Sequence, residues 1–407
     1  MDDTVTKAAQ RTDHRGSAGE VFATFLKLGL TSFGGPIAHL GYFRDELVVR
    51  RRWIDERGYA DLVALCQFLP GPASSQTGFA LGLLRAGPLG AAAAWAAVTL
   101  PSAILLVLFA FGAASFGAPI GSGVIHGLKV VAVAIVAQAV WGMARNLCPD
   151  RERASIALAA VLIVVLVSGS VGQLAAIVVG GLAGLLLCRR KGEAITGHVS
   201  FPVSNSVGGI ALVLFFGLLF GLPIAAAITS SQGLAVFDAF YRAGSLVFGG
   251  GHVVLPLLQA EVVQPGWVMA DHFLAGYGAA QAVPGPLFTF AAYLGAALGP
   301  EPNGLIGAAV AVIAIFLPGF LLLIGTIPFW DAFRTRPAAQ ALMRGANAAV
   351  VGVLGAALYQ PVWTSAIVGP HEFALALICV VLLMSWKSPP WIVVVVSAIG
   401  GVLIGFA

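Results

Sequence analysis

The chain has 407 residues, of which 59% are hydrophobic and only 10% are charged, against roughly 25% charged in an average soluble domain. This composition excludes a water-soluble fold, a disordered chain and a small disulfide-rich secreted domain. It favours a polytopic membrane protein that is surrounded by the lipid bilayer. The formal net charge of +4 is spread over short loops and forms no basic face, so nucleic acid is not an expected partner.

Thirteen apolar segments follow one another along the chain. The many glycines suit close helix packing in a membrane, where prolines can also serve as deliberate breaks. We therefore predict an all-α fold. The segments are residues 21–43, 59–84, 88–113, 124–143, 154–169, 171–188, 208–228, 235–258, 272–298, 303–327, 340–359, 371–386 and 390–407.

Residue types that usually carry catalysis or metal binding are scattered. The four cysteines show neither C-x-x-C nor Cys/His spacing, so we expect no metal, no redox centre and no cofactor. A nucleophile triad, a His-Glu-x-x-His helix and a nucleotide-binding loop are missing from the sequence, which argues against an enzyme. The N-terminal stretch ahead of the first apolar segment is polar, and we expect a short tail without a cleavable signal peptide.

Two motifs occur twice at a nearly constant separation. The pattern F-x-K/R-x-G-x-x-x-F-G-G at residues 25–35 returns 215 positions later at residues 240–250. The pattern Q-x-x-P-G-P at residues 67–72 returns 214 positions later at residues 281–286, and Pro101 has a counterpart in Pro318. The sequence thus predicts two homologous halves, residues 1–205 with the polar tail and residues 206–407 with a linking helix at 208–228.

The first two segments of each half contain a Gly-Gly or Pro-Gly-Pro break near the middle, so neither can be one straight helix. If these broken segments enter and leave the membrane on one side, 19 of the 22 Lys and Arg residues lie in cytoplasmic loops and none lies in an outside loop. We prefer this re-entrant topology to one in which every segment spans. In both topologies the second half is inverted relative to the first, an arrangement typical of secondary transporters.

A break inside a membrane helix leaves backbone amides without partners, and a helix start suits an anion. Pro72 and Pro286 are predicted to be first helical residues, which would aim the following amides at the break. The hydroxyls of Ser75 and Thr289, at equivalent positions, and of Ser74 could add donors for a tetrahedral oxyanion. Local capping and helix packing are the alternatives for these hydroxyls.

The remaining neutral candidates are the glycines and amides of the two breaks. The glycine pairs Gly34-Gly35 and Gly249-Gly250 permit close approach of the backbone to a ligand, or else tight helix packing. The two glutamines can donate hydrogen bonds without adding charge, or else join helices. Besides the hydroxyl residues, the predicted neutral site residues are Gly34, Gly35, Gln67, Pro70, Gly71, Pro72, Gly249, Gly250, Gln281, Pro284, Gly285 and Pro286.

Charged residues inside membrane segments cost about 3 kcal/mol or more unless they have a partner or a function. Lys27 and Arg242 occupy equivalent positions, each at the same short distance before a glycine pair, so we expect them to contact a dianion or to gate its passage. Snorkelling to the membrane surface is the alternative. Lys129 aligns with the neutral Asn347, has no matched charge, and is expected to snorkel.

Four titratable residues are candidates for proton coupling. Glu46 and Glu261 match at the same separation as the glycine pairs but lie at membrane edges, where an interfacial ion pair is the alternative. His39 and His252 lie close to the two breaks without being equivalent. Each could titrate near neutral pH or simply form a hydrogen bond.

These motifs carry a family resemblance. The stretches FLKLGLTSFGGPIAHLGYFRDELV and LCQFLPGPASSQ in the first half, and FYRAGSLVFGGGHVVLPLL and AAQAVPGPLFTFAAYLG in the second, resemble the long two-domain form of the chromate ion transporter family. The resemblance covers nearly the whole chain. One departure is that Gly251 stands where the first half has Pro36.

The resemblance implies a carrier that exports chromate from the cytoplasm across the bacterial inner membrane and confers chromate resistance. The multi-pass chain would have a cytoplasmic N-terminus and an outside C-terminus. Alternatives are a carrier of sulfate or another oxyanion, a gated anion channel and, last, a structural membrane protein. The oligomeric state is open, with a homodimer as one option.

Overall fold

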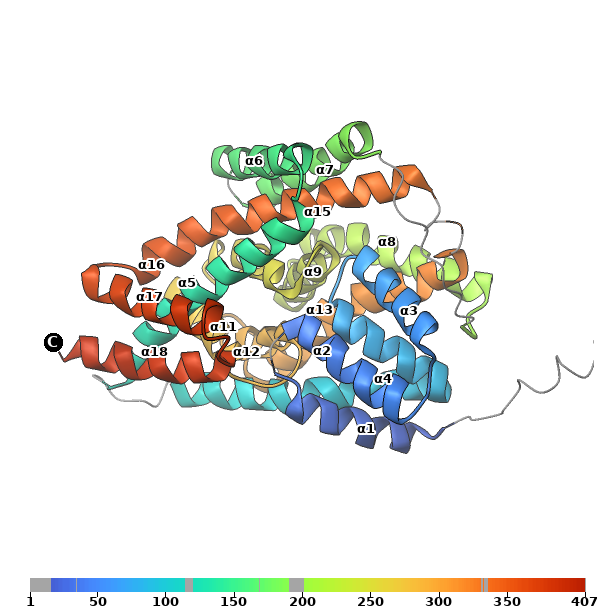
Figure 1. Ribbon diagram of the computed structural model, residues 1–407, viewed down its shortest axis with the longest axis horizontal. Coiled ribbons are helices and arrows are strands. Elements are labelled where there is room, and N and C mark those ends of the chain that lie inside the picture. Colours follow the sequence, from blue (N-terminus) through green and yellow to red (C-terminus); the bar gives the residue numbers. More distant parts are fainter. Residues whose placement is uncertain are drawn as a thin grey trace, which may run out of the picture.

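The computed structural model describes residues 16–33, 35–113, 120–167, 169–189, 201–330, 332 and 336–406. Throughout this described part the regular elements are helices, as predicted (Figure 1). The elements of the first half are α1 (Ala18–Thr31), α2 (Gly35–Phe43), η1 (Arg44–Arg50), α3 (Glu56–Phe68), α4 (Ala73–Ala113), α5 (Ile120–Leu147), α6 (Arg151–Leu166) and α7 (Ser170–Leu187).

The second half repeats this order after one extra helix. That helix, α8 (Asn205–Thr229), covers the predicted linking helix. The remaining elements are α9 (Gln232–Ser245), η2 (Gly251–Val253), α10 (Val254–Leu258), η3 (Gln259–Val263), α11 (Ala270–Ala280), η4 (Leu287–Thr289), α12 (Phe290–Ala296), α13 (Gly304–Thr326), η5 (Ile327–Phe329), α15 (Pro337–Ala357), η6 (Leu358–Trp363), α16 (Thr364–Ala366), α17 (Pro370–Met384) and α18 (Pro390–Gly405).

Six helices in the described part are long and apolar enough to cross a membrane. They begin at residues 73, 121, 170, 205, 304 and 337. The linking helix α8 is the least covered of them, with only 11% of its apolar window buried, and large side chains such as Phe216 and Phe220 are exposed along it. Such a surface requires hydrocarbon around it, so the protein is an integral membrane protein.

The breaks fall where the sequence predicts them. Segment 21–43 divides into α1 and α2, and segment 59–84 divides between α3 and the start of α4. The predicted boundary near residue 86 is a kink, because Ala86 and Gly87 leave helical geometry inside α4. The prediction that Pro72 and Pro286 begin their helices is wrong by one residue. Each proline instead precedes the helix, and the Pro72 carbonyl accepts the Gln76 N–H at 2.9 Å.

The two Pro-Gly-Pro breaks are each bound to the other half of the chain. The Gly71 N–H donates to the Val247 carbonyl at 2.7 Å, and the Gly285 N–H donates to the Ser32 carbonyl at 3.0 Å. Ser32 and Val247 are themselves equivalent, since each comes just before the Phe-Gly-Gly motif of its own half. The Pro-Gly-Pro break of each half is therefore fixed to the Phe-Gly-Gly break of the other, which is the reciprocity that a pseudo-twofold axis produces.

The same two glycines also pack on helices of the other half. Gly71 lies against the helix that contains Pro318, and Gly285 lies against the helix that contains Pro101, the counterpart of Pro318. A Cβ on Gly71 would lie 3.1 Å from the Gly319 Cα, and a Cβ on Gly285 would lie 2.8 Å from the Ser102 Oγ. Gly319 and Ser102 directly follow Pro318 and Pro101. Gly71 has φ +121° and Gly285 has φ +109°, so both the backbone geometry and the close approach require glycine.

The long helices α5 and α15 are exchanged between the halves in the same way. Helix α15 lies against α6 and α7, whereas α5 lies against α17 and α18 (Figure 1). Gly345 of α15 touches the backbone of Gly184, and Gly127 of α5 accepts a hydrogen bond from the Ser397 hydroxyl at 2.8 Å. Neither half could keep these helices covered alone, so the two halves form one folding unit.

We expect Gly285→Ala to destabilise the protein, because an alanine must adopt φ +109° and its Cβ meets Ser102. Strain of this kind costs about 1–3 kcal/mol. The measurement is the midpoint of thermal unfolding of purified protein in detergent micelles. Gly217→Ala, in an open position of α8, is the control and should be neutral or slightly stabilising. Equal midpoints for the two variants would show that the break tolerates a side chain.

Candidate functional site

One cavity of about 570 Å³ lies where the breaks of both halves meet. Each of the four breaks contributes a segment just after the chain interruption: Gly35, Pro72–Ser74, Gly249–His252 and Pro286–Phe288. Four pairs of equivalent residues are included, because Gly35, Pro72, Ala73 and Ser74 correspond to Gly250, Pro286, Leu287 and Phe288. Both halves therefore contribute equivalent residues to the cavity wall.

The four segments are helix starts. Helix α2 begins at Gly35, α4 begins at Ala73, and two further helical runs cover Gly251–Val263 and Leu287–Ala296. The first amides of a helix have no partner within it; in α4 the first backbone bond comes from Gln76. Each helix start carries roughly +0.5 of an elementary charge, so the four starts together place about +2 around the cavity.

The cavity wall carries no Lys, Arg, Asp or Glu among the residues that the structure describes. Its polar side chains are Gln67, Ser74, Gln138, Asn146, His252 and Asn347. A wall of neutral donors and helix starts, without fixed carboxylates, is suited to a small anion. Gln67, Asn146 and Gly249 are exposed, so the cavity opens to solvent at that end.

Three of these amides escaped the sequence analysis. Gln138 and Asn146 lie on α5, and Asn347 lies on α15, far in sequence from either break. The Oδ1 atom of Asn347 is buried and has no hydrogen-bond partner within the described structure. An amide side chain in an otherwise apolar helix was the sequence feature that could have indicated these residues. For Asn347, its alignment with Lys129 was a second such feature.

The structure brings part of the predicted neutral site together. The predicted residues that line the cavity are Gly35, Gln67, Gly71, Pro72, Ser74, Gly249, Gly250, His252 and Pro286. The predicted residues outside its lining are Pro70, Ser75, Gln281, Pro284, Gly285 and Thr289. Gly34 falls outside the described residues.

Local bonding explains several of these placements. The Thr289 hydroxyl donates to the Pro286 carbonyl at 2.7 Å, which is the local capping alternative. The Gly285 amide is bound to Ser32, as described above. The Ser75 hydroxyl is buried and unpartnered within the described structure, one residue beyond the cavity-lining Ser74.

The two matched cations pair with the two matched carboxylates. Lys27 Nζ lies 3.5 Å from the Glu46 carboxylate, and Arg242 lies 2.7 Å from Glu261 and 3.1 Å from Asp238. Neither cation lines the cavity. The interfacial ion pair that the sequence offered as an alternative for Glu46 and Glu261 is thus present in both halves. The ion pair of the first half joins α1 to η1, and that of the second half joins α9 to η3.

The surroundings of the two carboxylates differ. Glu46 also contacts Arg50 at 3.2 Å and Arg51 at 2.9 Å. The Arg51 hydrogen bond lowers the pKa of Glu46, so the stabilisation from this cluster is present at neutral pH and is lost on acidification. Glu261 and Asp238, by contrast, share the single guanidinium of Arg242, and their side chains are only 10% and 8% exposed.

The two histidines also lie in different places. His39 is buried outside the cavity lining, with Nε2 3.1 Å from the Ser32 carbonyl. His252 lines the cavity, and its Nδ1 lies 2.7 Å from the Tyr277 hydroxyl. Of the two, only His252 can therefore meet a ligand in the cavity in this conformation.

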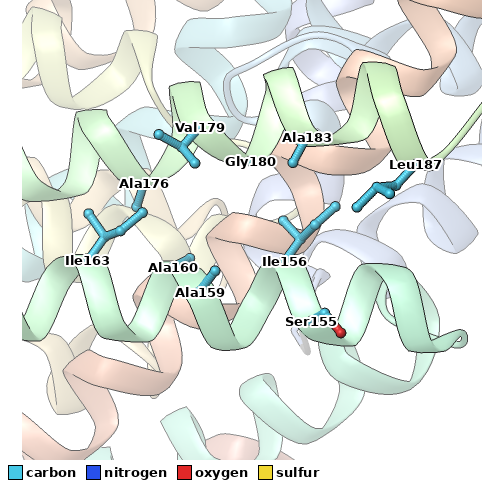
Figure 2. Close-up of a pocket in the computed structure, with 10 residues that line it drawn as sticks. All are labelled: Ser155, Ile156, Ala159, Ala160, Ile163, Ala176, Val179, Gly180, Ala183 and Leu187. Atoms are coloured by element: carbon cyan, nitrogen blue, oxygen red, sulfur yellow. The ribbon is translucent and has the colours of Figure 1, made fainter.

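A second hollow, of about 170 Å³, lies between α6 and α7 (Figure 2). Figure 2 shows that its walls are alkyl side chains from both helices, such as Ile156, Ile163 and Val179, with the Ser155 hydroxyl as the polar exception. Such walls cannot replace the hydration shell of an anion. Of these two hollows, the cavity between the breaks is therefore the better candidate for an anion site.

Comparison with known proteins identifies the repeated unit. The family model described as "Chromate transporter" matches residues 19–185 and again residues 234–402. The chain is 29% identical to the chromate transport protein of Pseudomonas aeruginosa, over 94% of this chain and 90% of the relative. It is 30% identical to a probable chromate transport protein of Synechococcus elongatus, over 93% of both chains.

A third relative, the chromate transport protein of Cupriavidus metallidurans, is 29% identical over 92% of this chain and 90% of its own length. No solved structure shows a significant match. The offset between the starts of the two matched regions equals the separation of the Phe-Gly-Gly motifs, so the two halves are two copies of one family unit.

We expect Arg242→Gln to cost more stability than Lys27→Gln. Loss of Arg242 leaves two buried carboxylates without their cation, at a cost of about 1–3 kcal/mol, whereas Glu46 keeps two arginines when Lys27 is lost. The loss of an exposed pair costs below about 1 kcal/mol. Thermal unfolding in micelles measures both. A larger effect of Lys27→Gln would contradict the assigned partners.

We expect Asn347→Asp to weaken oxyanion binding at least tenfold, about 1.4 kcal/mol. The new carboxylate would face a dianion across a small cavity. Isothermal titration with sulfate measures the affinity. Asn205→Asp, the same change at the exposed start of α8, is the control and should bind like the unaltered protein. Unchanged affinity in Asn347→Asp would place the anion elsewhere.

Proposed function

Because the chain belongs to the chromate transporter family, we propose that it is a secondary transporter that exports chromate from the cytoplasm and thereby confers chromate resistance. The names of the relatives from Pseudomonas and Cupriavidus support chromate as the substrate. Membership of a transporter family, together with the spanning helices, supports carriage across the membrane rather than catalysis. Division of the chain at residue 205 into two inverted repeats is part of this proposal.

The observation that carries the proposal is the meeting of four helix starts in one neutral cavity. Chromate is a tetrahedral dianion, and the partial charges of the four starts sum to about +2. The amides after Pro72 and Pro286, the glycine pairs, and the side chains of Gln67 and Ser74 would bind its oxygens. Since no fixed cation lines the described cavity, the dianion can also leave, as transport requires.

The remaining predicted site residues receive supporting roles in the proposal. Ser75 and Thr289 support the helix starts that follow Pro72 and Pro286. The ion pairs of Lys27 and Arg242 hold the broken segments, which corresponds to gating and not to substrate contact. His252 is the proton-coupling candidate at the cavity, while His39, Glu46 and Glu261 would act on coupling only through the segments that they join.

The membrane potential is a sufficient driving force. A dianion that leaves a cell with a negative interior gains about 4.6 kcal/mol per 100 mV, twice the value for one charge. Export then requires no nucleotide hydrolysis. Alternating access would arise if the two halves rocked about the cavity between them.

The cavity mouth supports the proposed orientation. Asn146 at the mouth lies next to Arg145 and close to Arg151 and Arg153, which belong to the basic loops assigned to the cytoplasm. We therefore propose a cytoplasm-open conformation in the bacterial inner membrane, with a cytoplasmic N-terminus and an outside C-terminus.

The exposed Arg57 tests this topology. Arg57→Cys, in a cysteine-free background, should resist an impermeant thiol reagent in intact cells, because the re-entrant arrangement keeps this loop in the cytoplasm. Permeabilised cells provide the control, in which the same cysteine should react. Rapid labelling in intact cells would overturn the re-entrant arrangement.

Sulfate is the second candidate substrate, because it is also a tetrahedral dianion and the cavity offers nothing that distinguishes the two by charge. A gated anion channel would use the same helix starts. A channel would carry ohmic current and show no counter-transport of unlabelled substrate, whereas a carrier exchanges labelled for unlabelled anion.

The direct test is uptake of labelled chromate by inside-out vesicles from cells with and without the protein. We expect protein-dependent uptake that rises with an inside-positive vesicle potential and falls with excess sulfate. Membrane insertion is verified in the same vesicles by protease protection. Absence of uptake by correctly inserted protein would refute chromate export, and uptake of sulfate alone would establish the second candidate.

A further inference from the structure

The two long exchanged helices line the cavity unequally. The cavity is lined by the C-terminal part of α5, from Gln138 to Leu147, and by Asn347 in the middle of α15. The twofold-equivalent of Asn347 is Lys129, since the pattern Gly127-x-Lys129 returns in the other half as Gly345-x-Asn347. Lys129 precedes Asn146 on α5 by about 25 Å along the helix axis, toward the opposite membrane face.

At Lys129 the equivalent of the cavity is closed. The Lys129 Nζ donates to the Asp271 Oδ1 of α11 at 2.7 Å. One turn earlier on α5, His126 Nε2 lies 3.1 Å from the Glu372 carboxylate of α17. Between these pairs, Gly278 of α11 packs directly on the backbone of Leu128. Two polar contacts and one backbone contact thus seal the N-terminal part of α5.

The exposure of the two partners shows which one faces inward. The Lys129 side chain is only 10% exposed, whereas the Asp271 side chain is 62% exposed. The stem of Lys129 is therefore covered while its ammonium reaches an exposed carboxylate, an arrangement compatible with the snorkelling expected from the sequence. A buried lysine is costly in a membrane protein, and the equivalent position in the other half holds a neutral asparagine. Closure alone does not explain why a cation stands there.

We propose that Lys129 is a substrate-binding residue of the opposite-open conformation, in which the dianion takes the place of the Asp271 carboxylate on its Nζ. This inference rests on the proposed function. In the conformation described here Asp271 neutralises Lys129 and holds α11 against α5. When α11 moves away, the cavity closes at Asn347 and opens at its equivalent, so that Lys129 meets the departing anion while Asp271 enters water.

The charge swap K129D/D271K separates this role from a structural ion pair. A purely structural pair survives the swap and transport should continue. If Lys129 binds the dianion, the swap retains the ion pair and the thermal stability but places a carboxylate in the anion path, and we expect sulfate and chromate flux in proteoliposomes to fall at least tenfold. K129R, which keeps the cation, should retain flux within about threefold.

The swap is interpreted against two further measurements. Sulfate affinity in the cytoplasm-open conformation should be unchanged, because Lys129 does not line that cavity. If the swap does not fold, the neutral pair K129Q/D271N replaces it, with the same expected loss of flux. Flux at the level of the unaltered protein in either folded double variant would overturn the inference.

Opening of the α5–α11 contact can be followed independently of flux. Ala275→Cys, placed on the buried side of α11 between Asp271 and Gly278 in a cysteine-free background, should react slowly with an impermeant thiol reagent and faster when D271N is added. Equal rates would show that Asp271 does not hold this face closed and would overturn the inference. Failure of the unaltered protein to carry either anion would instead refute the proposed function.

Discussion

Two backbone hydrogen bonds, from Gly71 to Val247 and from Gly285 to Ser32, fix the arrangement on which the rest of the structure depends. A broken helix in hydrocarbon must find partners for its free amides and carbonyls, because lipid offers none. Here each Pro-Gly-Pro break uses the Phe-Gly-Gly break of the other half. Backbone groups that would lack hydrogen-bond partners in either half alone therefore find them in the other half.

This reciprocity also creates the cavity. Once the four breaks are joined in pairs, the helices that follow them all begin around one common cavity. The resulting field is positive without any charged side chain in the described wall. In the conformation described here, this neutral wall lets a dianion exchange with solvent, because no lysine or arginine lines the described cavity. Fixed charges are instead placed away from the cavity, where Lys27, Arg242 and Lys129 each have a carboxylate partner.

Much of this could be predicted from the sequence, because the features concerned are local. Prolines and glycines indicate the breaks at Gly71 and Gly285, the fixed separation indicates the repeat, and the lack of polar residues indicates the membrane. The exact helix start could not be predicted, because a proline suits both the first helical position and the position before it. Pro72 and Pro286 occupy the latter.

The amides of the wall and the partners of the cations depend on how distant helices cross. Gln138 and Asn347 have no matched motif, so only the packing of α5 and α15 reveals that they share a cavity. The equivalence of Glu46 and Glu261 was visible in the sequence, yet only the distances show that these carboxylates are the partners of the two matched cations. Repetition indicated which residues are equivalent, and packing determined what each contacts.

The central claim is that an oxyanion binds where the four helix starts meet. It is tested most directly by Ser74→Cys in a cysteine-free background, because Ser74 lines the cavity in the first turn of α4. We predict that saturating sulfate slows the reaction of this cysteine with a small thiol reagent, while a cysteine at the exposed Arg57 reacts at the same rate with or without sulfate. Equal reaction of the Ser74→Cys variant in both conditions, in protein that still transports, would contradict binding at this place.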